Sequence, residues 1–236
     1  MIFGEMKPDD AEGAILAHSR KVGSETFKKG RRLSAADIAA LKAEGVASVI
    51  ATRLEADDVA EDEAAKALAK ALAGNNIRAA APFTGRANLH AEAGGIVEID
   101  AARIAAINAI GEAITVATLA PHETVATRQM LATIKIIPFA VPRAELDRAL
   151  AIAHDGASAM VLHAFKPHRI GLVATQLPDT KQSVMDKSRA VLDARLAAMG
   201  GAIAHEIRCD HNELAVAGAV GELIAAGLSP ILIFGA

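Results

Sequence analysis

Carboxylate, lysine and serine side chains gather in one short segment near the carboxyl end of the sequence, residues 176–188. Its candidate functional residues are Asp179, Lys181, Ser183, Asp186, Lys187 and Ser188. The lysines and the backbone amides of a helix start near Ser188 would hold a phosphate or pyrophosphate. Asp179 or Asp186 would hold a divalent metal with its waters. The residue types equally fit a solvated loop in which Asp186 caps a helix.

The elements around this loop predict a parallel α/β unit. A strand over 170–175 precedes it, and a helix to Met199, a strand over 202–207, a helix to about Ala226 and a strand over Ile231–Phe234 follow it. Such alternation favours a parallel sheet, and open parallel sheets bind ligands at the carboxyl ends of their strands. Asp210, just after the second strand, would either cap the next helix or point into that crevice.

These segments also carry a family resemblance. The motifs are Leu172-Val173-Ala174-Thr175, the Asp186-Lys187-Ser188 step into a helix, Leu192…Leu196…Gly200, Asp210 and residues 231–235. They resemble the molybdopterin-binding domain of molybdenum cofactor biosynthesis proteins. Residues 27–34, followed by Asp37-Ile38…Leu41…Gly45-Val46, resemble the segment that precedes this domain in molybdopterin molybdotransferases.

The resemblance implies a transferase that acts on molybdopterin with Mg²⁺. It gives Asp179 and Asp186 catalytic roles, with Asp186 at the metal. It assigns substrate binding to Thr175, Lys181, Ser183, Lys187, Ser188, Asp210 and Gly235. The family's third strand leads into a Thr-Gly-Gly-Thr-Gly loop and a catalytic acid, whereas this sequence reads Phe234-Gly235-Ala236. We therefore expect a domain truncated after its third strand and inactive by itself.

Two alternatives remain open. The first is a non-catalytic pterin- or nucleotide-binding module that serves a downstream nucleotidyltransferase domain. The second is the related fold of competence-damage-inducible proteins, which is linked to pyridine-nucleotide hydrolysis. Because that group typically starts directly at the βαβ unit, the basic segment 27–34 ahead of the unit favours the molybdopterin readings.

Composition narrows the function classes further. The 236 residues carry a net charge of −3 and include no Trp, no Tyr and six Phe, so the aromatic stacking platforms of single-strand nucleic-acid binders are missing. We expect no nucleic-acid partner. The sequence contains one cysteine, and it shows neither an apolar run long enough for a membrane span nor a secretion signal at the amino terminus. We therefore expect a cytoplasmic protein without a membrane partner.

Residues 1–166 predict a mixed α+β region, with a boundary near Lys166-Pro167 and a three-layer α/β/α domain over 167–236. Helices are expected over 34–44, 61–72, 101–110 and 143–153. Ser34 and Asp37 would form a capping box, and Gly45 would end that helix. Segments 88–92 and 96–99 predict a hairpin. Segment 130–141 predicts a strand in which Pro138 marks either an edge or a bend.

Three further features lead to expectations: a glycine turn, a lysine within an apolar strand, and the last strand of the sequence. The segment Thr84-Gly85-Arg86-Ala87-Asn88, a glycine turn with one cation and one amide, would cap an oxyanion, although a purely structural turn is favoured. Lys135 lies in an apolar strand, where alternation favours a side chain that extends to solvent over one that enters a pocket. If Ile231–Phe234 is a central strand of a larger sheet, the backbone groups on one of its sides are unpaired here. Such an edge can pair with a strand of a second chain, so a homo-oligomer is expected.

Overall fold

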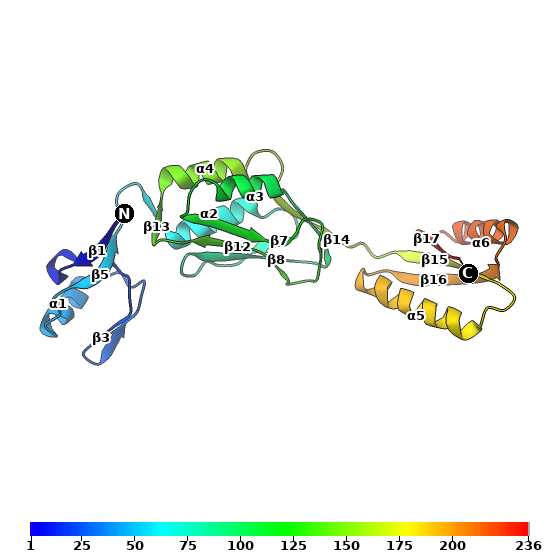
Figure 1. The fold of residues 1–236 in the computed structure, drawn as a ribbon, viewed down its shortest axis with the longest axis horizontal. Coiled ribbons are helices and arrows are strands. Elements are labelled where there is room, and N and C mark those ends of the chain that lie inside the picture. Colours follow the sequence, from blue (N-terminus) through cyan, green and yellow to red (C-terminus); the bar gives the residue numbers. More distant parts are fainter. Residues whose placement is uncertain (236) are drawn as a thin grey trace. The chain divides into compact units, whose positions relative to one another are not determined.

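The computed structural model describes residues 1–235 and comprises two compact units (Figure 1). The division falls between His163 and Ala164, three residues before the expected boundary near Lys166-Pro167. Each unit has its own hydrophobic core, and none of the buried apolar clusters in the described residues draws members from both units. The fold is α/β, with a mixed α+β first unit and a βαβαβ second unit.

The first unit combines short antiparallel sheets with four α-helices. The helices are α1 (Ala35–Ala43), α2 (Glu61–Leu72), α3 (Ala101–Asn108) and α4 (Arg143–Ala153), with a 3-10 turn at Pro8–Asp10. The strands are β1 (Ile2–Met6), β2 (Ile15–Leu16), β3 (Arg20–Val22), β4 (Glu25–Phe27), β5 (Val49–Arg53), β6 (Asp58–Ala60), β7 (Ile77–Ala79), β8 (Arg86–Ala91), β9 (Gly95–Ile99), β10 (Ile114–Thr118), β11 (Thr124–Val125), β12 (Met130–Ile136), β13 (Ala140–Pro142) and β14 (Met160–Ala164).

Local sequence signals explain the helix ends. The Ser34 hydroxyl accepts the Asp37 amide while the Asp37 carboxylate accepts the Ser34 amide, so the predicted capping box is confirmed. Gly45 follows α1 at φ +66°, a left-handed conformation that glycine adopts without steric cost. Asp100 caps α3 through the Arg103 amide, and Pro142 precedes α4.

Two sequence expectations for this unit are wrong. Segments 88–92 and 96–99 do not form a hairpin: β8 pairs with β7 and β12, whereas β9 pairs in a separate sheet with β11 and β14. The segment 130–141 is two strands, β12 and β13, with Pro138 between them. Proline has no amide proton to donate to a ladder, which explains the break.

The second unit is a parallel three-stranded sheet with two helices. Its strands are β15 (Arg169–Gln176), β16 (Ala202–Asp210) and β17 (Ile231–Phe234), and its helices are α5 (Gln182–Ala198) and α6 (Glu213–Ala225). The strand order is β16-β15-β17, so the first strand of the unit lies in the middle. Within the described residues β17 pairs only with β15, so its other side is open, as expected from the sequence.

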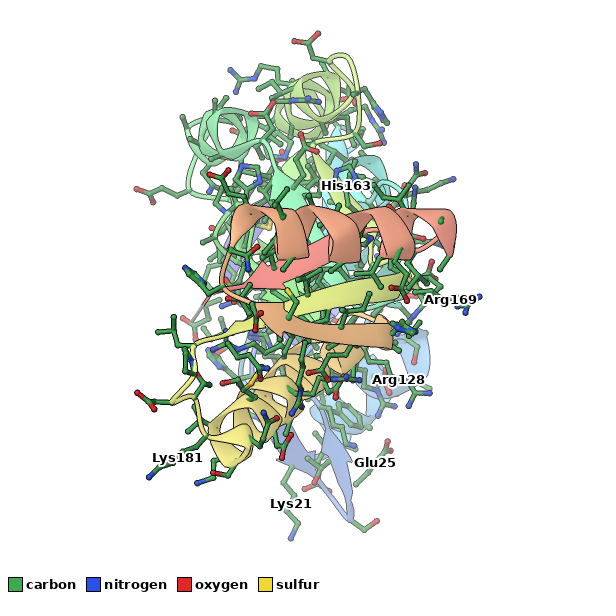
Figure 2. All side chains as sticks on the ribbon, turned by 90° about the vertical axis from the view of Figure 1, so that its right-hand side faces the viewer. Lys21, Glu25, Arg128, His163, Arg169 and Lys181 are labelled. Atoms are coloured by element: carbon green, nitrogen blue, oxygen red, sulfur yellow. The ribbon has the colours of Figure 1, made fainter. Side chains whose placement is uncertain are left out.

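Alternate residues of β15 face opposite helices, as the two-residue strand period requires. On one face, Val173 packs with Ala219, Leu223 and Leu228, which places α6 there. On the other face, Leu172 and Ala174 line a cavity shared with α5. The two helices therefore cover opposite sides of the sheet (Figures 1 and 2).

The start of α5 differs from the sequence expectation. The helix begins at Gln182 and not near Ser188, so Ser183, Asp186, Lys187 and Ser188 belong to its first two turns. Asp186 therefore does not cap the helix. The cap position is Lys181, whose side chain makes no capping hydrogen bond.

Candidate functional site

A small cavity opens at the carboxyl ends of β15 and β17, on the α5 side of the sheet. Its volume is about 100 Å³. The apolar part of its wall comes from β15, α5 and the end of β17: Leu172, Ala174, Val184, Met185, Leu192 and Phe234. Thr175, Thr180, Ser188 and Gly235 add polar atoms and backbone. The cavity continues into a groove of about 310 Å³ that includes Lys187, Val191 and Arg195.

The strand order explains why the cavity forms there. The connection through α5 leads from β15 to β16 on one side, and the connection through α6 leads to β17 on the other side. The α5 connection leaves the carboxyl end of β15, whereas the α6 connection leaves the carboxyl end of β16 and enters β17 at its amino end. The cavity thus lies between the carboxyl ends of β15 and β17, at the edge where open α/β sheets bind their ligands.

Thr175 joins the three chain segments at this edge. Its hydroxyl lies 3.2 Å from the Phe234 carbonyl oxygen, to which it donates, and 2.9 Å from His211 Nδ1. A carbonyl can only accept, so with the hydroxyl proton directed to Phe234 the His211 Nδ1–H donates to the Thr175 oxygen. The buried Thr175 thus fixes the end of β17 and the start of the α6 connection.

The amino end of α5 presents backbone donors. A helix leaves its first amides without intrahelical partners, and no side chain caps this one. The preceding turn is rigid, because the Thr180 hydroxyl accepts the Leu177 amide at 2.9 Å and the Leu177 carbonyl accepts the Thr180 amide at 3.0 Å. Lys181 projects outward from this end of the helix (Figure 2). The helix start therefore has the donors and positive charge that suit an oxyanion.

An ion-pair network fastens α5 to β16. Glu206 accepts from Arg208 at 2.7 Å and from Arg189 at 2.6 Å. Arg208 also binds Asp186 at 2.7 Å, and Arg189 binds Asp193 at 2.8 Å. Burial disfavours the Glu206 carboxylate, but the hydrogen bonds from both arginines outweigh burial and hold its pKa below the ordinary 4.5. The network holds the α5 wall of the cavity in place.

This network predicts an acid-dependent loss of stability. Because the pKa of Glu206 is lowered on folding, its contribution is complete above pH 4.5 and disappears as the pH falls through the folded-state value. We expect Glu206→Gln to cost about 1–3 kcal/mol of unfolding free energy at pH 7, with the difference from wild type shrinking below pH 4.5. Urea unfolding followed by circular dichroism from pH 3 to 7 measures this. Glu112→Gln, at an exposed position outside the network, is the control, and a pH-independent difference would contradict the assignment.

The structure brings some of the predicted site residues together and separates others. Thr175, Ser188 and Gly235 line the cavity, and Lys187 lines the adjoining groove. Lys181 and Ser183 are exposed at the amino end of α5, and Asp179 is exposed in the preceding turn. Asp210 is exposed at the end of β16 and does not cap α6, since the Asn212 side chain accepts the Ala215 amide instead.

Sequence reasoning missed four residues of this site: Arg189, Glu206, Arg208 and His211. The i, i+4 spacing of Arg189 and Asp193 was visible in the sequence and indicates a helical ion pair. The contacts of Glu206 and His211 depend on which strands are neighbours, and no local signal reveals that. Within residues 1–235, no group of three or more His, Cys, Asp or Glu side chains could hold a metal ion.

Comparison with known proteins gives one match. Residues 5–53 match the family model of a domain of unknown function, DUF8806. This segment corresponds to the core formed by Ala11–Ala51 in the first unit and contains no residue of the cavity. No curated protein and no solved structure matches the chain. Among the described residues, the helices are too short or too polar to cross a bilayer.

Proposed function

We propose that residues 164–236 form a binding site for a phosphorylated pterin of the molybdopterin class, serving molybdenum cofactor biosynthesis. The observation that carries the proposal is the cavity at the carboxyl ends of β15 and β17, lined by Thr175, Ser188 and Gly235. These are residues to which the family resemblance assigns substrate binding. The position is also where parallel α/β sheets bind ligands.

The chemistry of the walls suits such a ligand. The pterin ring would lie in the apolar part of the cavity and the groove, in contact with Val184, Leu192 and Phe234. Thr180 and Ser188 would supply hydrogen bonds to it. The cavity alone, at about 100 Å³, is smaller than the ~300–1,000 Å³ of typical ligand sites. The ligand therefore extends into the groove of about 310 Å³ along α5.

The phosphate is assigned to the amino end of α5. Uncapped amides and the dipole of a 17-residue helix favour an anion there. Lys181 and Ser183 flank this end, whereas Lys187 follows six residues later, about 9 Å along a helix axis. One phosphate group is thus reached by Lys181 and Ser183, and Lys187 contacts a different part of the ligand.

A resident Mg²⁺ does not fit the arrangement of these side chains. The Asp186 carboxylate is paired with Arg208 at 2.7 Å, and Asp179 lies in an exposed turn outside the cavity wall. Mg²⁺ commonly binds through one or two carboxylates together with phosphate oxygens of the ligand. We therefore propose that Mg²⁺, where it takes part in binding, enters the site together with the ligand.

Binding without turnover is the form of the proposal that the geometry favours. The acidic side chain in the cavity wall is Glu206, and its lowered pKa keeps it ionised between two arginines. Both of its arginine partners hold it in the network that joins α5 to β16. This arrangement favours a pterin-binding module over a transferase whose catalytic groups all lie in this unit.

Pterin fluorescence gives a direct test of this function. The chain contains no Trp and no Tyr, so the emission of a bound pterin is measured without protein background. We expect saturable quenching or anisotropy change when an oxidised, fluorescent molybdopterin derivative that keeps its phosphate is titrated with the protein. A titration without saturation, or equal binding of unphosphorylated pterin, contradicts the proposal.

Lysine substitutions locate the phosphate. We expect Lys181→Ala to weaken molybdopterin binding about tenfold, because a charge-assisted contact contributes ~1.5–3 kcal/mol, and Lys187→Ala to weaken it less. Lys66→Ala, at an exposed position of α2 in the first unit, is the matched control. Unchanged affinity in calorimetry for both Lys181→Ala and Lys187→Ala contradicts the placement of the phosphate on α5.

A further inference from the structure

A second cavity, of about 540 Å³, lies on the first unit. It sits over the outer face of the sheet β10-β12-β8-β7, whose other face is covered by α2. The burial pattern of β8 alternates, so Ala87 and Leu89 face the core while Arg86 and Asn88 face outward. Arg86, Asn88 and Lys135 form the floor of the cavity.

Two cations lie side by side on this floor. Lys135 of β12 is the direct cross-strand partner of Arg86 of β8. Like charges at directly opposed positions destabilise a sheet, and arginine cannot lose its proton to relieve the repulsion. Within the described residues neither side chain has an ion-pair partner. The pair therefore offers two unneutralised charges to one bound anion.

The rim of the cavity is a rigid turn. Phe83 and Arg86 exchange two backbone hydrogen bonds across Thr84 and Gly85, both of which have positive φ. Type I′ turns require this conformation, but it is costly for a β-branched threonine. The Gly85 amide donates to Asp62 at 2.8 Å, and its carbonyl accepts the Ile136 amide at 2.7 Å. These bonds hold the strained turn over the floor.

Glycine is required at the centre of this turn. A Cβ on Gly85 would lie 2.5 Å from the Ile136 carbonyl oxygen and 2.9 Å from Glu61 Oε2. Glu61 and Asp62 are therefore close to the turn, but neither lines the cavity. The cavity wall itself carries two cations and no carboxylate.

The mouth of the cavity is apolar. Phe83 is 76% exposed and Ile137 is 62% exposed, and both belong to the lining. Large apolar side chains left in water beside a charged floor suit a ligand with an apolar body and an anionic group. We propose that this cavity binds a phosphate monoester with an aromatic or apolar body, its phosphate between Arg86 and Lys135 and its body against Phe83.

Phenyl phosphate is the probe for this site, titrated into the full chain and followed by the amide NMR shifts of residues 84–88 and 135–137. We expect saturable shifts there, weakened about tenfold by Arg86→Gln or by Lys135→Gln. Arg78→Gln, the control, removes an exposed cation of β7 that does not line the cavity and should leave the affinity unchanged. Saturable shifts that survive both cavity substitutions, or no saturation in the wild type, overturn the proposal.

Two further comparisons identify the ligand class. Phe83→Ala should lower the affinity for phenyl phosphate to that for inorganic phosphate, because the aromatic contact is lost. Lys135→Glu, which places a carboxylate opposite Arg86, should abolish binding and raise the melting temperature. Equal affinity for phthalate and phenyl phosphate overturns the phosphate assignment. Since these readouts lie in the first unit, they are independent of pterin binding by the second.

Discussion

Leu223→Ala is expected to destabilise the second unit by about 2–5 kcal/mol. Leu223 is fully buried on α6, and it packs against bare backbone, because a Cβ on Gly171 of β15 would lie 3.0 Å from its Cδ1 atom. Among the described residues, the buried cluster around Leu223 comprises Val173, Ala219, Leu223 and Leu228. A domain of this size has a small free energy of unfolding. The cavity that replaces the leucine side chain therefore removes a large part of that free energy.

Hydrogen exchange separates this effect by unit. In Leu223→Ala we expect the amides of β15 to lose protection while those of β8 and β12 keep theirs, because the two units share no core cluster. Leu68→Ala, which empties a fully buried position on α2, should give the opposite pattern. Equal loss of protection in both units after Leu223→Ala would contradict the division between His163 and Ala164.

Ser188→Leu is expected to reduce pterin binding at least a hundredfold. Ser188 is half-buried in α5 and lines both the cavity and the groove, so a leucine there fills the space where they meet. Leucine is a better helix former than serine, and the helix should be retained. The loss of binding would therefore come from occupied volume and not from unfolding.

The fluorescence titration measures this change. Ala190→Leu is the matched control, because it adds a leucine at an exposed position of the same helix that lines neither the cavity nor the groove. We expect it to bind as the wild type does. Normal binding by Ser188→Leu would place the ligand elsewhere, and equal losses in the two variants would point to a general disturbance of α5.

Local signals predicted much of the fold. The apolar spacing of 61–72 and Pro142 ahead of 143–153 gave the bounds of α2 and α4, which the structure confirms. The capping box of Ser34 and Asp37 is also confirmed. The hairpin over 88–99 is wrong, because the glycines at 94 and 95 mark a turn but do not determine strand partners. Partners of β8 and β9 come from distant segments.

The candidate site was less predictable. Asp186-Lys187-Ser188 has the residue types of a helix start, yet Met185 extends the helical spacing of Leu192 and Leu196 upstream of Ser188 and indicates an earlier start. The actual start has no capping side chain to reveal it. The Thr175–His211 contact spans 36 residues and exists only because β15 lies between β16 and β17. Such contacts depend on strand order.

Hydrogen exchange with and without molybdopterin tests the central claim most directly. We expect saturating ligand to slow exchange at the amino end of α5 and at the ends of β15 and β17, residues 174–188 and 231–235. Outside the cavity around Arg86 and Lys135, we expect no change in residues 1–163. Ligand-induced protection confined to the first unit, or no protection in 174–188 at a concentration that saturates the fluorescence titration, would contradict a pterin site at the carboxyl ends of β15 and β17.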